Sequence, residues 1–365
     1  MLTTLRIHNY RCFRKLTVEG LTRVSLLVGA NNAGKTSVLE AAELVLGGTN
    51  PAILSRSPQS RGEIGLVRSE PGSLRHYLEV NHLFRGHVLQ PGASFEIDAL
   101  TGDGSRFFSC KVIPRPSGRL EGDEEAPPPE LLRPGPNLVL SVSADRMGPD
   151  AHVFPMVGYS LWLGLLRNAA TPSLDKAWKV RFLETAAPPV WALRELWDDV
   201  VLTPEEEKAT NALQIIEPDI ERLAALSGSR GQTGGGMFVK LKGSDERIPL
   251  GSMGEGLKRL LALSLNVVSS AGGYLLVDEI DTGLHHSVMT RMWRLVVEAA
   301  RRLDVQVLAT THSLDCVRAL ASLYEESPNV RDLISLHRIE RGAEASVPYS
   351  ADEILAAAQH QMELR

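Results

Sequence analysis

This sequence of 365 residues has few cysteines, no large excess of charge of either sign and no long apolar run. The three cysteines lie far apart and have no metal-ligand spacing, which argues against a disulfide framework or a zinc site. We expect reduced thiols in a cytoplasmic protein, each buried as a small hydrophobic side chain. These cysteines are Cys12, Cys110 and Cys316.

No uninterrupted apolar run reaches the ~18 residues that a membrane-spanning helix needs, and the N-terminus lacks a basic segment followed by an apolar core. We therefore expect neither a membrane span nor an export signal. The 39 Lys and Arg residues nearly balance the 44 Asp and Glu residues, for a formal net charge of −5. This balance gives no overall attraction for nucleic acid or an anionic membrane, so any such contact needs a local patch.

The strongest positive signal is the segment 29–36, Gly-Ala-Asn-Asn-Ala-Gly-Lys-Thr, which fits the pattern G-x-x-x-x-G-K-[ST]. An apolar run at 24–28 predicts a buried strand before it, and 36–46 predicts a helix after it. The glycines let backbone N–H groups converge on an anion, and the helix dipole favours negative charge there. Lys35 would reach the β and γ phosphates of ATP, and the Thr36 hydroxyl would ligate Mg²⁺. The nucleotide-binding residues predicted here are Gly29, Asn31, Asn32, Gly34, Lys35, Thr36 and Ser37.

A second apolar strand, Tyr-Leu-Leu-Val at 274–277, ends in Asp278 and Glu279. Such a fully apolar run is typical of a parallel strand buried on both faces, which would put both carboxylates at the carboxyl edge beside the phosphate loop. Asp278 would hold Mg²⁺, and Glu279 would orient and deprotonate the attacking water.

A third strand is predicted at 305–309, followed by Thr310-Thr311-His312-Ser313. His312 at this position could reach the γ-phosphate or the attacking water. The alternative is an incidental histidine beside Ser313, which makes a good helix cap.

A second glycine turn, Leu-Gly-Ser-Met-Gly-Glu-Gly at 250–256, precedes a helix predicted at 257–268. It is another anion-binding helix end. One nucleotide needs only one such cradle, so the second turn predicts a contact with the nucleotide of another copy. The active unit would then be a dimer with ATP sandwiched at the interface.

The motifs above lie in what we predict to be the ATPase core, and the other segments are predicted to be additions to it. We predict an α/β fold with a mostly parallel sheet, whose core comprises residues 1–50 and 236–365. Residues 51–145 predict a β-rich insertion with an exposed loop of proline and acid at 114–136, and the strand at 138–145 would rejoin the core with polar, ligand-facing residues at its end.

Residues 146–235 are predicted to form a short helical arm, since their pattern turns helical from about residue 155. A helix is marked by Thr203 as its cap and Pro204 at its first position. Four tryptophans favour core packing between helices over a base-stacking surface. They are Trp162, Trp178, Trp191 and Trp197.

Several basic residues have two interpretations. The four arginines between residues 51 and 75 could form a nucleic-acid patch, but a solvated loop face is favoured; they are Arg56, Arg61, Arg68 and Arg75. Four others are plausible phosphate or adenine contacts, although surface salt bridges would also account for them; they are Arg11, Arg146, Lys258 and Arg259. A metal site shared by His285 and His286 is disfavoured, because adjacent helical residues point about 100° apart.

These motifs, in this order, resemble the ABC-type ATPase heads of the SMC and RecF class, with 252–255 (Ser-Met-Gly-Glu) as signature turn and His312 as switch histidine. The opening segment 7–13, Ile-His-Asn-Tyr-Arg-Cys-Phe, resembles the first strand of those heads. More narrowly, segments 278–285 and 216–220 look like the ATPase domain of the overcoming-lysogenisation-defect (OLD) family and its stand-alone relatives in bacterial defence systems.

The resemblance implies head-to-head dimerisation, with Ser252 and Gly254 contacting the γ-phosphate held by the opposite chain, and Glu255 and Arg11 as further nucleotide contacts. His285 follows Leu284, as in the OLD-like branch. Transporter-type heads have an aspartate at this position instead. The glutamine that senses Mg²⁺ in this class is unassigned, and Gln90 is only a candidate.

An OLD protein is expected to carry a TOPRIM nuclease domain after its ATPase. Only about 50 residues follow His312, too few for such a domain, so any nuclease would be a separate polypeptide. The favoured function is therefore an ATP-dependent dimeric switch for a separate effector, a TOPRIM-type nuclease, in defence or DNA repair. The alternatives are a RecF-like ATPase that binds DNA without a nuclease partner and, disfavoured by the long interval between Lys35 and Asp278, the nucleotide-binding subunit of a membrane transporter.

Overall fold

The computed structural model describes residues 1–48, 50–70, 73–117, 137–144, 152–169, 179–226, 236–360 and 362, without the side chains of 67–70 and 73–74. The chain forms two compact units, each assembled from three separate segments. Unit 1 comprises Met1–Glu19, Thr36–Trp178 and Glu340–Ser346, and unit 2 comprises Gly20–Lys35, Lys179–Ile339 and Val347–Arg365.

Unit 1 is organised by a nine-stranded sheet in the order β2-β1-β6-β7-β8-β9-β10-β5-β4, in which all neighbours are antiparallel. Alternate residues of β6 are buried, as in a sheet that packs one face on a core. The strands are β1 (Leu2–His8), β2 (Lys15–Glu19), β4 (Ile64–Glu70), β5 (Ser73–Glu79), β6 (Ser94–Thr101), β7 (Gly104–Pro114), β8 (Leu138–Ala144), β9 (His152–Val157) and β10 (Ser160–Trp162).

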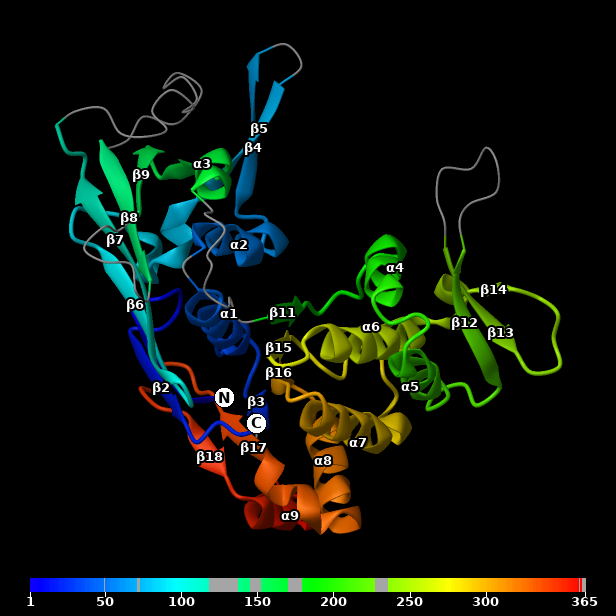
Figure 1. The fold of residues 1–365 in the computed structure, drawn as a ribbon. Coiled ribbons are helices and arrows are strands. Elements are labelled where there is room, and N and C mark those ends of the chain that lie inside the picture. Colours follow the sequence, from blue (N-terminus) through cyan, green and yellow to red (C-terminus); the bar gives the residue numbers. More distant parts are fainter. Residues whose placement is uncertain are drawn as a thin grey trace. The chain divides into compact units, whose positions relative to one another are not determined.

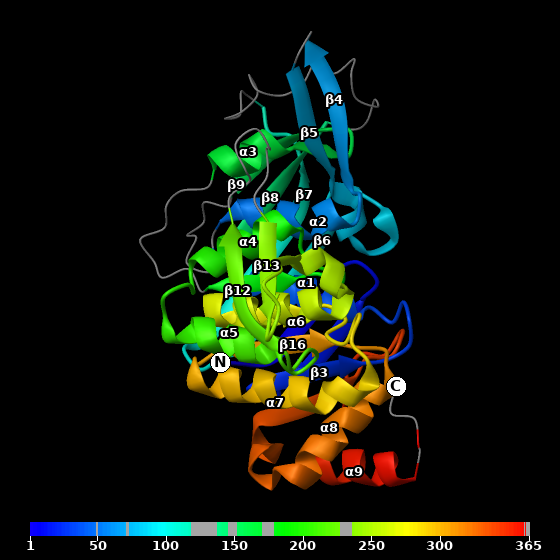
Figure 2. The same cartoon turned by 90° about the vertical axis from the view of Figure 1, so that its right-hand side faces the viewer.

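The helices of this unit are short except for the first, which continues directly from the phosphate loop. They are α1 (Lys35–Leu46), α2 (Arg56–Ser60) and α3 (Leu163–Asn168), with single 3₁₀ turns η1 (Pro51–Ser55), η2 (Val80–Leu83) and η3 (Arg85–His87). Figure 2 shows β4 and β5 as a long hairpin of the sheet.

Unit 2 contains a six-stranded sheet in the order β11-β15-β16-β3-β17-β18, parallel except for the last pair. β3, β15 and β16 are buried along their whole length, which explains why each is an uninterrupted or nearly uninterrupted apolar run. The strands are β3 (Val24–Val28), β11 (Val180–Leu183), β15 (Tyr274–Val277), β16 (Gln306–Thr310), β17 (Ile334–Arg338) and β18 (Val347–Tyr349).

The described part of unit 2 has six helices, of which α6 contacts β11 and is in turn contacted by α4, α5 and α7; Figure 2 shows α7, α8 and α9 in succession beside one another. They are α4 (Val190–Asp198), α5 (Pro204–Leu213), α6 (Glu255–Ser269), α7 (His286–Arg302), α8 (Leu314–Glu326) and α9 (Ala351–Gln359). A small antiparallel sheet of β12 (Ile220–Leu226), β13 (Gly236–Leu241) and β14 (Ile248–Pro249) completes the unit, with 3₁₀ turns η5 (Leu250–Met253) and η6 (Pro328–Leu333).

Three sequence-based predictions about these elements are wrong. The segment 155–226 is not uniformly helical, because β10, β11 and β12 lie within it. β10 and β11 are short and pair with β5 and β15, which are far away in the chain, so local periodicity does not reveal them. β12 pairs with β13, the next strand in the chain. The strand predicted at 138–145 is β8, which lies between β7 and β9 in the antiparallel sheet and does not join the parallel one. Cys12 is exposed, whereas Cys110 and Cys316 are buried as expected.

The prediction that the tryptophans pack in the core is correct for one residue and wrong for another. Trp197 is buried in the core of unit 2, but Trp191 is 64% exposed, because it lies on the outer face of α4. Trp178, the end residues Asp145 and Arg146, and most of the loop 114–136 lie outside the described residues. The partition into core, insertion and arm stays a prediction. Within the described residues, no helix is both long and apolar enough to cross a membrane.

Candidate functional site

The phosphate loop leaves the carboxyl end of β3, in the middle of the parallel sheet of unit 2 (Figure 1). Its backbone takes positive φ angles at Gly29 (148°), Asn32 (62°) and Gly34 (100°). A Cβ atom at Gly29 would lie 2.4 Å from the carbonyl oxygen of Ile339, so only glycine fits at this position. Asn31 and Asn32 are exposed at the tip of the loop.

Lys35 is turned back onto the loop that precedes it. Its Nζ donates hydrogen bonds to the carbonyl oxygens of Gly29, at 2.9 Å, and Ala30, at 3.2 Å, and the residue is only 6% exposed. Burial lowers the pKa of the Lys35 ammonium, while Glu279 and Asp278 act in the opposite direction. A buried cation beside two carboxylates, held by carbonyls that a stronger anion could replace, fits a phosphate-binding lysine. Thr36 and Ser37 follow it directly in α1, and by their packing they belong to unit 1.

Asp278 lies at the carboxyl end of β15 with both carboxylate oxygens hydrogen-bonded to threonine. Oδ1 accepts a hydrogen bond from Thr310 at 2.7 Å, and Oδ2 accepts one from Thr185 at 2.9 Å. These threonines follow or end the two strands that flank β15, so the sheet itself fixes the orientation of the carboxylate. Partners of this kind commonly orient metal-binding carboxylates.

Glu279 has a left-handed backbone conformation, with φ of 49°, which is uncommon for a residue other than glycine. Its N–H donates to Thr310 Oγ1 at 2.8 Å, and its carbonyl oxygen accepts from Arg259 at 2.9 Å. The carboxylate Oε2 lies 2.6 Å from Nδ1 of His312. Contacts on both sides of its peptide group and at its carboxylate therefore hold Glu279 in a conformation that it would not favour alone.

Arg259 is the residue that ties these parts together, and it is only 1% exposed. It lies in the first turns of α6, where Nη1 donates to the carbonyl oxygen of Glu184 and Nη2 donates to those of Asp278, at 2.6 Å, and Glu279. Burial lowers the pKa of Arg259 to about 10, against the opposing effect of Asp278, Asp281 and Glu279. It is thus neither a surface salt bridge nor, in this arrangement, a phosphate contact, because backbone carbonyls occupy both terminal nitrogens of its guanidinium.

The second glycine turn leads into α6 from η5. Gly254 has a φ of 94° and caps the helix without a side-chain hydrogen bond, and Ser252, Gly254 and Glu255 are all exposed. The Glu255 carboxylate forms an ion pair with Lys258 one turn later. Gly256 lies against the loop that follows the acid pair, since a Cβ there would be 2.6 Å from the carbonyl oxygen of Gly283. The turn is therefore open to solvent on one side and packed against the acid-pair loop on the other.

A cavity of about 430 Å³ lies between the first turns of α6, the segment 185–190 and the loop at 282–283. Thr185 and Arg259, which contact the acid pair, both line it. The structure thus brings the phosphate loop, Asp278, Glu279 and His312 together in unit 2, as the sequence predicts, and adds Thr185, which sequence reasoning missed.

Two predicted site residues have other surroundings. Arg11, in unit 1, is 8% exposed, with Nε 2.6 Å from a Glu40 oxygen and both terminal nitrogens bonded to Glu63 at 2.7 and 3.1 Å. These carboxylates occupy its guanidinium, so the assignment of Arg11 to the nucleotide is at odds with this geometry. Gln90 is exposed in the turn before β6, and in unit 2 the place beside Asp278 is taken by Thr185.

The remaining candidates have structural roles. His285 caps α7, with Nδ1 accepting a hydrogen bond from the Ser287 N–H at 3.4 Å. Among the described residues there is no group of three or more His, Cys, Asp or Glu that could hold a metal ion. The two Mg²⁺ ligands predicted from sequence, Thr36 and Asp278, belong to different units, and the Mg²⁺ site stays a prediction.

Two domain models match the chain. One described as "AAA domain, putative AbiEii toxin, Type IV TA system" matches residues 165–316, which include the second glycine turn, the acid pair and His312. Another, described as "AAA ATPase domain", matches residues 1–66, which include the phosphate loop. A Helicobacter pylori protein named "ATP/GTP phosphatase" is 22% identical over 351 residues, 89% of each chain.

Two solved structures are similar in fold. An SMC head bound to the C-terminal winged-helix domain of ScpA has a TM-score of 0.52 and 14% identity over 96% of this chain and 97% of that one. A Pyrococcus furiosus SMC head with an extended coiled coil, bound to the C-terminal domain of ScpA, has a TM-score of 0.51 and 11% identity over 99% of both chains. The chain has the α/β fold of an SMC ATPase head, and with its phosphate loop, acid pair and matching ATPase domain models it is an enzyme that hydrolyses ATP.

Proposed function

We propose that this ATPase is a dimeric switch, in which two copies close on ATP and thereby control a separate effector. The observation that carries the proposal is the open glycine turn before α6. Unit 2 already has the phosphate loop as far as Lys35 beside its acid pair, yet it presents a second, exposed helix N-terminus with no side-chain cap. Such an end favours an anion, and the second copy's ATP is the anion that would complete the site.

The chemistry follows from what each residue is placed to do. Lys35 exchanges the carbonyls of Gly29 and Ala30 for phosphate oxygens. Thr36 and Asp278 would hold Mg²⁺, which would neutralise charge on the phosphates. Glu279 takes a proton from the attacking water, and His312, at 2.6 Å, positions its carboxylate.

The dimer interface completes the reaction site in this proposal. Ser252 and Gly254 of the second copy bind the γ-phosphate, whose release would open the dimer. Gly256 packs against Gly283 in the loop after the acid pair. Movement of the turn onto a phosphate would therefore shift the loop that follows Asp278 and Glu279. Glu255 is exposed beside this turn, so it stays a candidate contact once its pairing with Lys258 is broken.

The effector we favour is a TOPRIM-type nuclease acting in defence against foreign DNA. Support comes from the resemblance of segments 278–285 and 216–220 to OLD-family ATPases, and from the description of the matching domain model, which names a type IV toxin–antitoxin system. The SMC heads similar in fold are bound to ScpA in their structures, so partner binding is a known use of this fold.

A DNA clamp without a protein partner is the less favoured alternative. Its electrostatic basis was the group of arginines between residues 51 and 75, and two of these are already paired in unit 1. Arg61 lies 2.6 Å from Glu40, and Arg56 lies 3.4 Å from Glu43. Arg75 lies over the ring of Trp162, 5.0 Å from its centroid. A surface committed to these contacts is a weak polyanion site.

The test uses tagged Glu279→Gln protein purified with ATP from its own host, because loss of the base should hold the dimer closed. We expect a dimer by light scattering and one co-purifying protein in fixed ratio, identified by mass spectrometry. Tagged Lys35→Ala protein, unable to bind ATP, serves as the matched control and should yield monomer without that protein. DNA alone in the eluate would favour the clamp, and wild-type hydrolysis by Glu279→Gln would refute the base assignment.

A further inference from the structure

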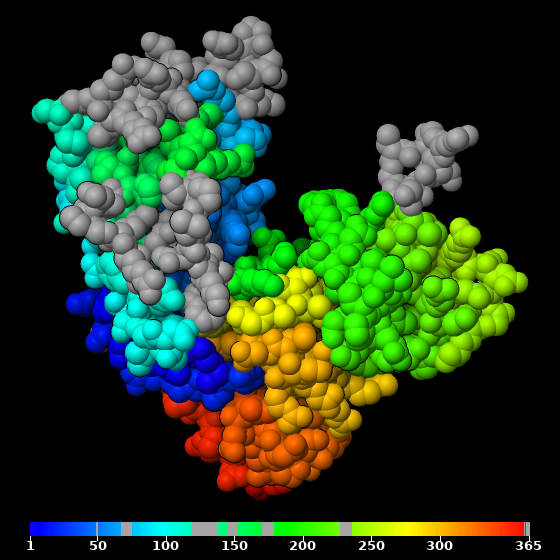
Figure 3. Space-filling model, in the orientation of Figure 1, coloured from blue at the N-terminus to red at the C-terminus, as the bar shows by residue number. Residues whose placement is uncertain are grey.

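A hollow of about 840 Å³ lies across α5, α6 and α7, away from the residues of the nucleotide site. Its floor is apolar and is formed by Ala212, Ile215, Val268, Leu295 and Ala299. All but Ala212 are only partly buried, although they pack against the core of unit 2. Figure 3 shows the surface of α5, in green, bordering that of α7, in orange. We call this hollow the α5–α7 groove.

The rim of the groove is basic. Five basic side chains line it against two acidic ones, in a chain whose net charge is −5. Arg302 is bonded to Glu205, and Arg294 to Glu326. The described contacts give no ion-pair partner to Arg291 or Arg301, so the rim has positive charge to spare.

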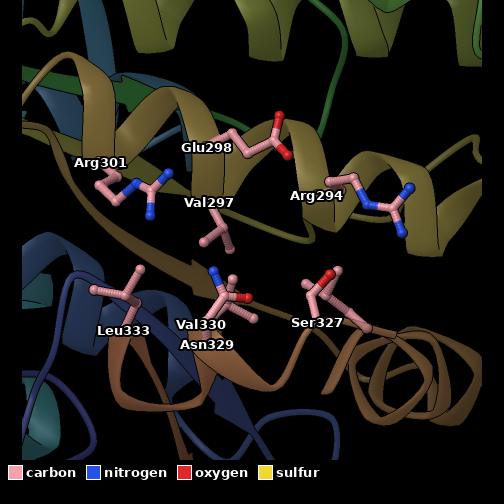
Figure 4. A pocket seen from close by; sticks show the side chains of 9 residues that line it. Arg294, Val297, Glu298, Arg301, Ser327, Asn329, Val330 and Leu333 are labelled. Atoms are coloured by element: carbon pink, nitrogen blue, oxygen red, sulfur yellow. The ribbon is translucent and has the colours of Figure 1, made fainter. Parts of the chain in front are cut away.

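Two of the rim arginines also lie beside a second hollow, on the other side of α7. Arg294, Glu298 and Arg301 also line a smaller hollow of about 70 Å³ on the side of α8 and η6 (Figure 4). The outer face of α7 is thus a ridge of arginines with a recess on either side. Isolated exposed arginines are ordinary, but a basic rim around an apolar floor is what an interface for a charged amphipathic partner requires.

We infer that the α5–α7 groove is the docking site for a helix of a partner protein, one with an apolar stripe flanked by acidic residues. Arg291 and Arg302 are separated by about 16 Å along α7, room for three turns of such a helix. The stripe would cover the floor, and its carboxylates would take up the guanidinium groups of the rim in bidentate pairs. Duplex DNA has the charge but nothing apolar to cover the floor.

The groove also reaches the switch. Ser264 and Val268, which line it, lie on α6, and α6 begins at the exposed glycine turn. A docked helix would therefore contact the same rigid element that is proposed to close on ATP. This link between docking and nucleotide rests on the proposed function, whereas docking itself does not.

The test measures binding of a fluorescein-labelled peptide of about 18 residues, with leucine at the i, i+3, i+4 and i+7 positions and glutamate elsewhere. The full chain is titrated without nucleotide at about 0.15 M salt, and anisotropy is recorded. We expect saturable binding. A peptide with lysine in place of glutamate, and one with its leucines scrambled, should bind at least about tenfold more weakly, because each lacks one of the two features matched by the groove.

Variants locate the site. Arg291→Glu with Arg301→Glu should weaken binding of the glutamate peptide about tenfold or more, since attraction becomes repulsion. Arg222→Glu with Arg247→Glu makes the same charge change on exposed residues outside the groove and should leave binding within about twofold. Ala299→Glu, which puts a carboxylate on the floor while keeping every arginine, should also weaken it. ATP hydrolysis reports that each variant is folded.

Three results would overturn the inference. The lysine or scrambled peptide could bind equally well, the two double variants could weaken binding equally, or a short DNA duplex could bind more tightly and depend on the same two arginines. Since the titration contains no nucleotide, failure of ATP-driven dimerisation would not affect its outcome, and the two proposals stand or fall separately.

Discussion

The phosphate loop and the glycine turn before α6 each lead into the N-terminus of a helix, but their surroundings differ. The phosphate loop is enclosed: Lys35 is buried against carbonyls of its own loop, and the acid pair influences its charge. The turn before α6 is open, with Ser252 and Gly254 exposed, and the buried cation that follows it in α6, Arg259, is bonded to carbonyls of Glu184, Asp278 and Glu279 instead of the turn. In the proposed function, the enclosed loop would hold ATP with residues of one chain, and the open turn would bind a phosphate carried by a second copy.

The largest effect should come from breaking the enclosed cradle. Lys35→Ala should weaken ATP binding by about 100-fold or more, because it removes a buried charge-assisted contact to the phosphates. Lys258→Ala is the matched control on the open side, where the ammonium is paired with Glu255, and should change affinity by less than about threefold. Titration with a fluorescent ATP analogue measures both. An equal loss of ATP affinity in the two variants would show that the phosphate loop and the turn before α6 do not differ in this respect.

A smaller effect is expected at the open turn. Ser252→Arg should leave ATP affinity nearly unchanged but reduce hydrolysis by about 100-fold, since the second copy could no longer close on the γ-phosphate. Ser322→Arg, on the exposed side of α8, is the control and should be silent.

Mixing two inactive variants tests whether the turn acts on the nucleotide of the other copy. Combined Ser252→Arg and Lys35→Ala chains would form dimers that contain one intact composite site, so the mixture should regain a substantial part of the activity that each variant lacks alone. If no activity returned although mixed dimers were present, the turn would act within its own chain.

The smallest effect should follow from the contact that joins α6 to the acid pair. Arg259→Gln should lower kcat about tenfold with little change in KM for ATP, because Glu279 loses its backbone support but the phosphate loop is untouched. The free energy of unfolding should fall by roughly 2 kcal/mol, as carbonyls of three residues lose a donor. Arg259→Lys should recover part of kcat, and Arg222→Gln, an exposed control, should match the wild type. A loss in affinity equal to the loss in kcat would assign Arg259 to nucleotide binding.

The enclosed site was predictable from sequence because its signals are local. The run 24–28, the glycines, the lysine and the helix follow one another without interruption, and Asp278-Glu279 sit directly at the end of an apolar strand. Such short-range patterns report a strand end and a helix start reliably. The helix cap at Thr203, which accepts a hydrogen bond from the Glu205 N–H, was predictable for the same reason.

The remainder depended on contacts that no local pattern carries. β11 is four residues long and includes a charged residue, and it is a strand because it pairs with β15, which lies about 90 residues later. Thr185 gains its role only through that pairing. Arg259 looked like a solvent-facing cation because its acceptors are backbone carbonyls, which have no signature in the sequence. β8 was placed in the wrong sheet because a buried strand looks the same in either.

The order of strands around the phosphate loop also has a consequence during protein synthesis. β3 ends at Val28, yet its two neighbours in the sheet, β16 and β17, begin only at Gln306 and Ile334. Until they emerge from the ribosome, the strand that carries the loop has no partners in its sheet, and such non-local pairing is slow to form. A nascent chain would therefore be unable to complete the sheet around the phosphate loop until β16 and β17 have been made.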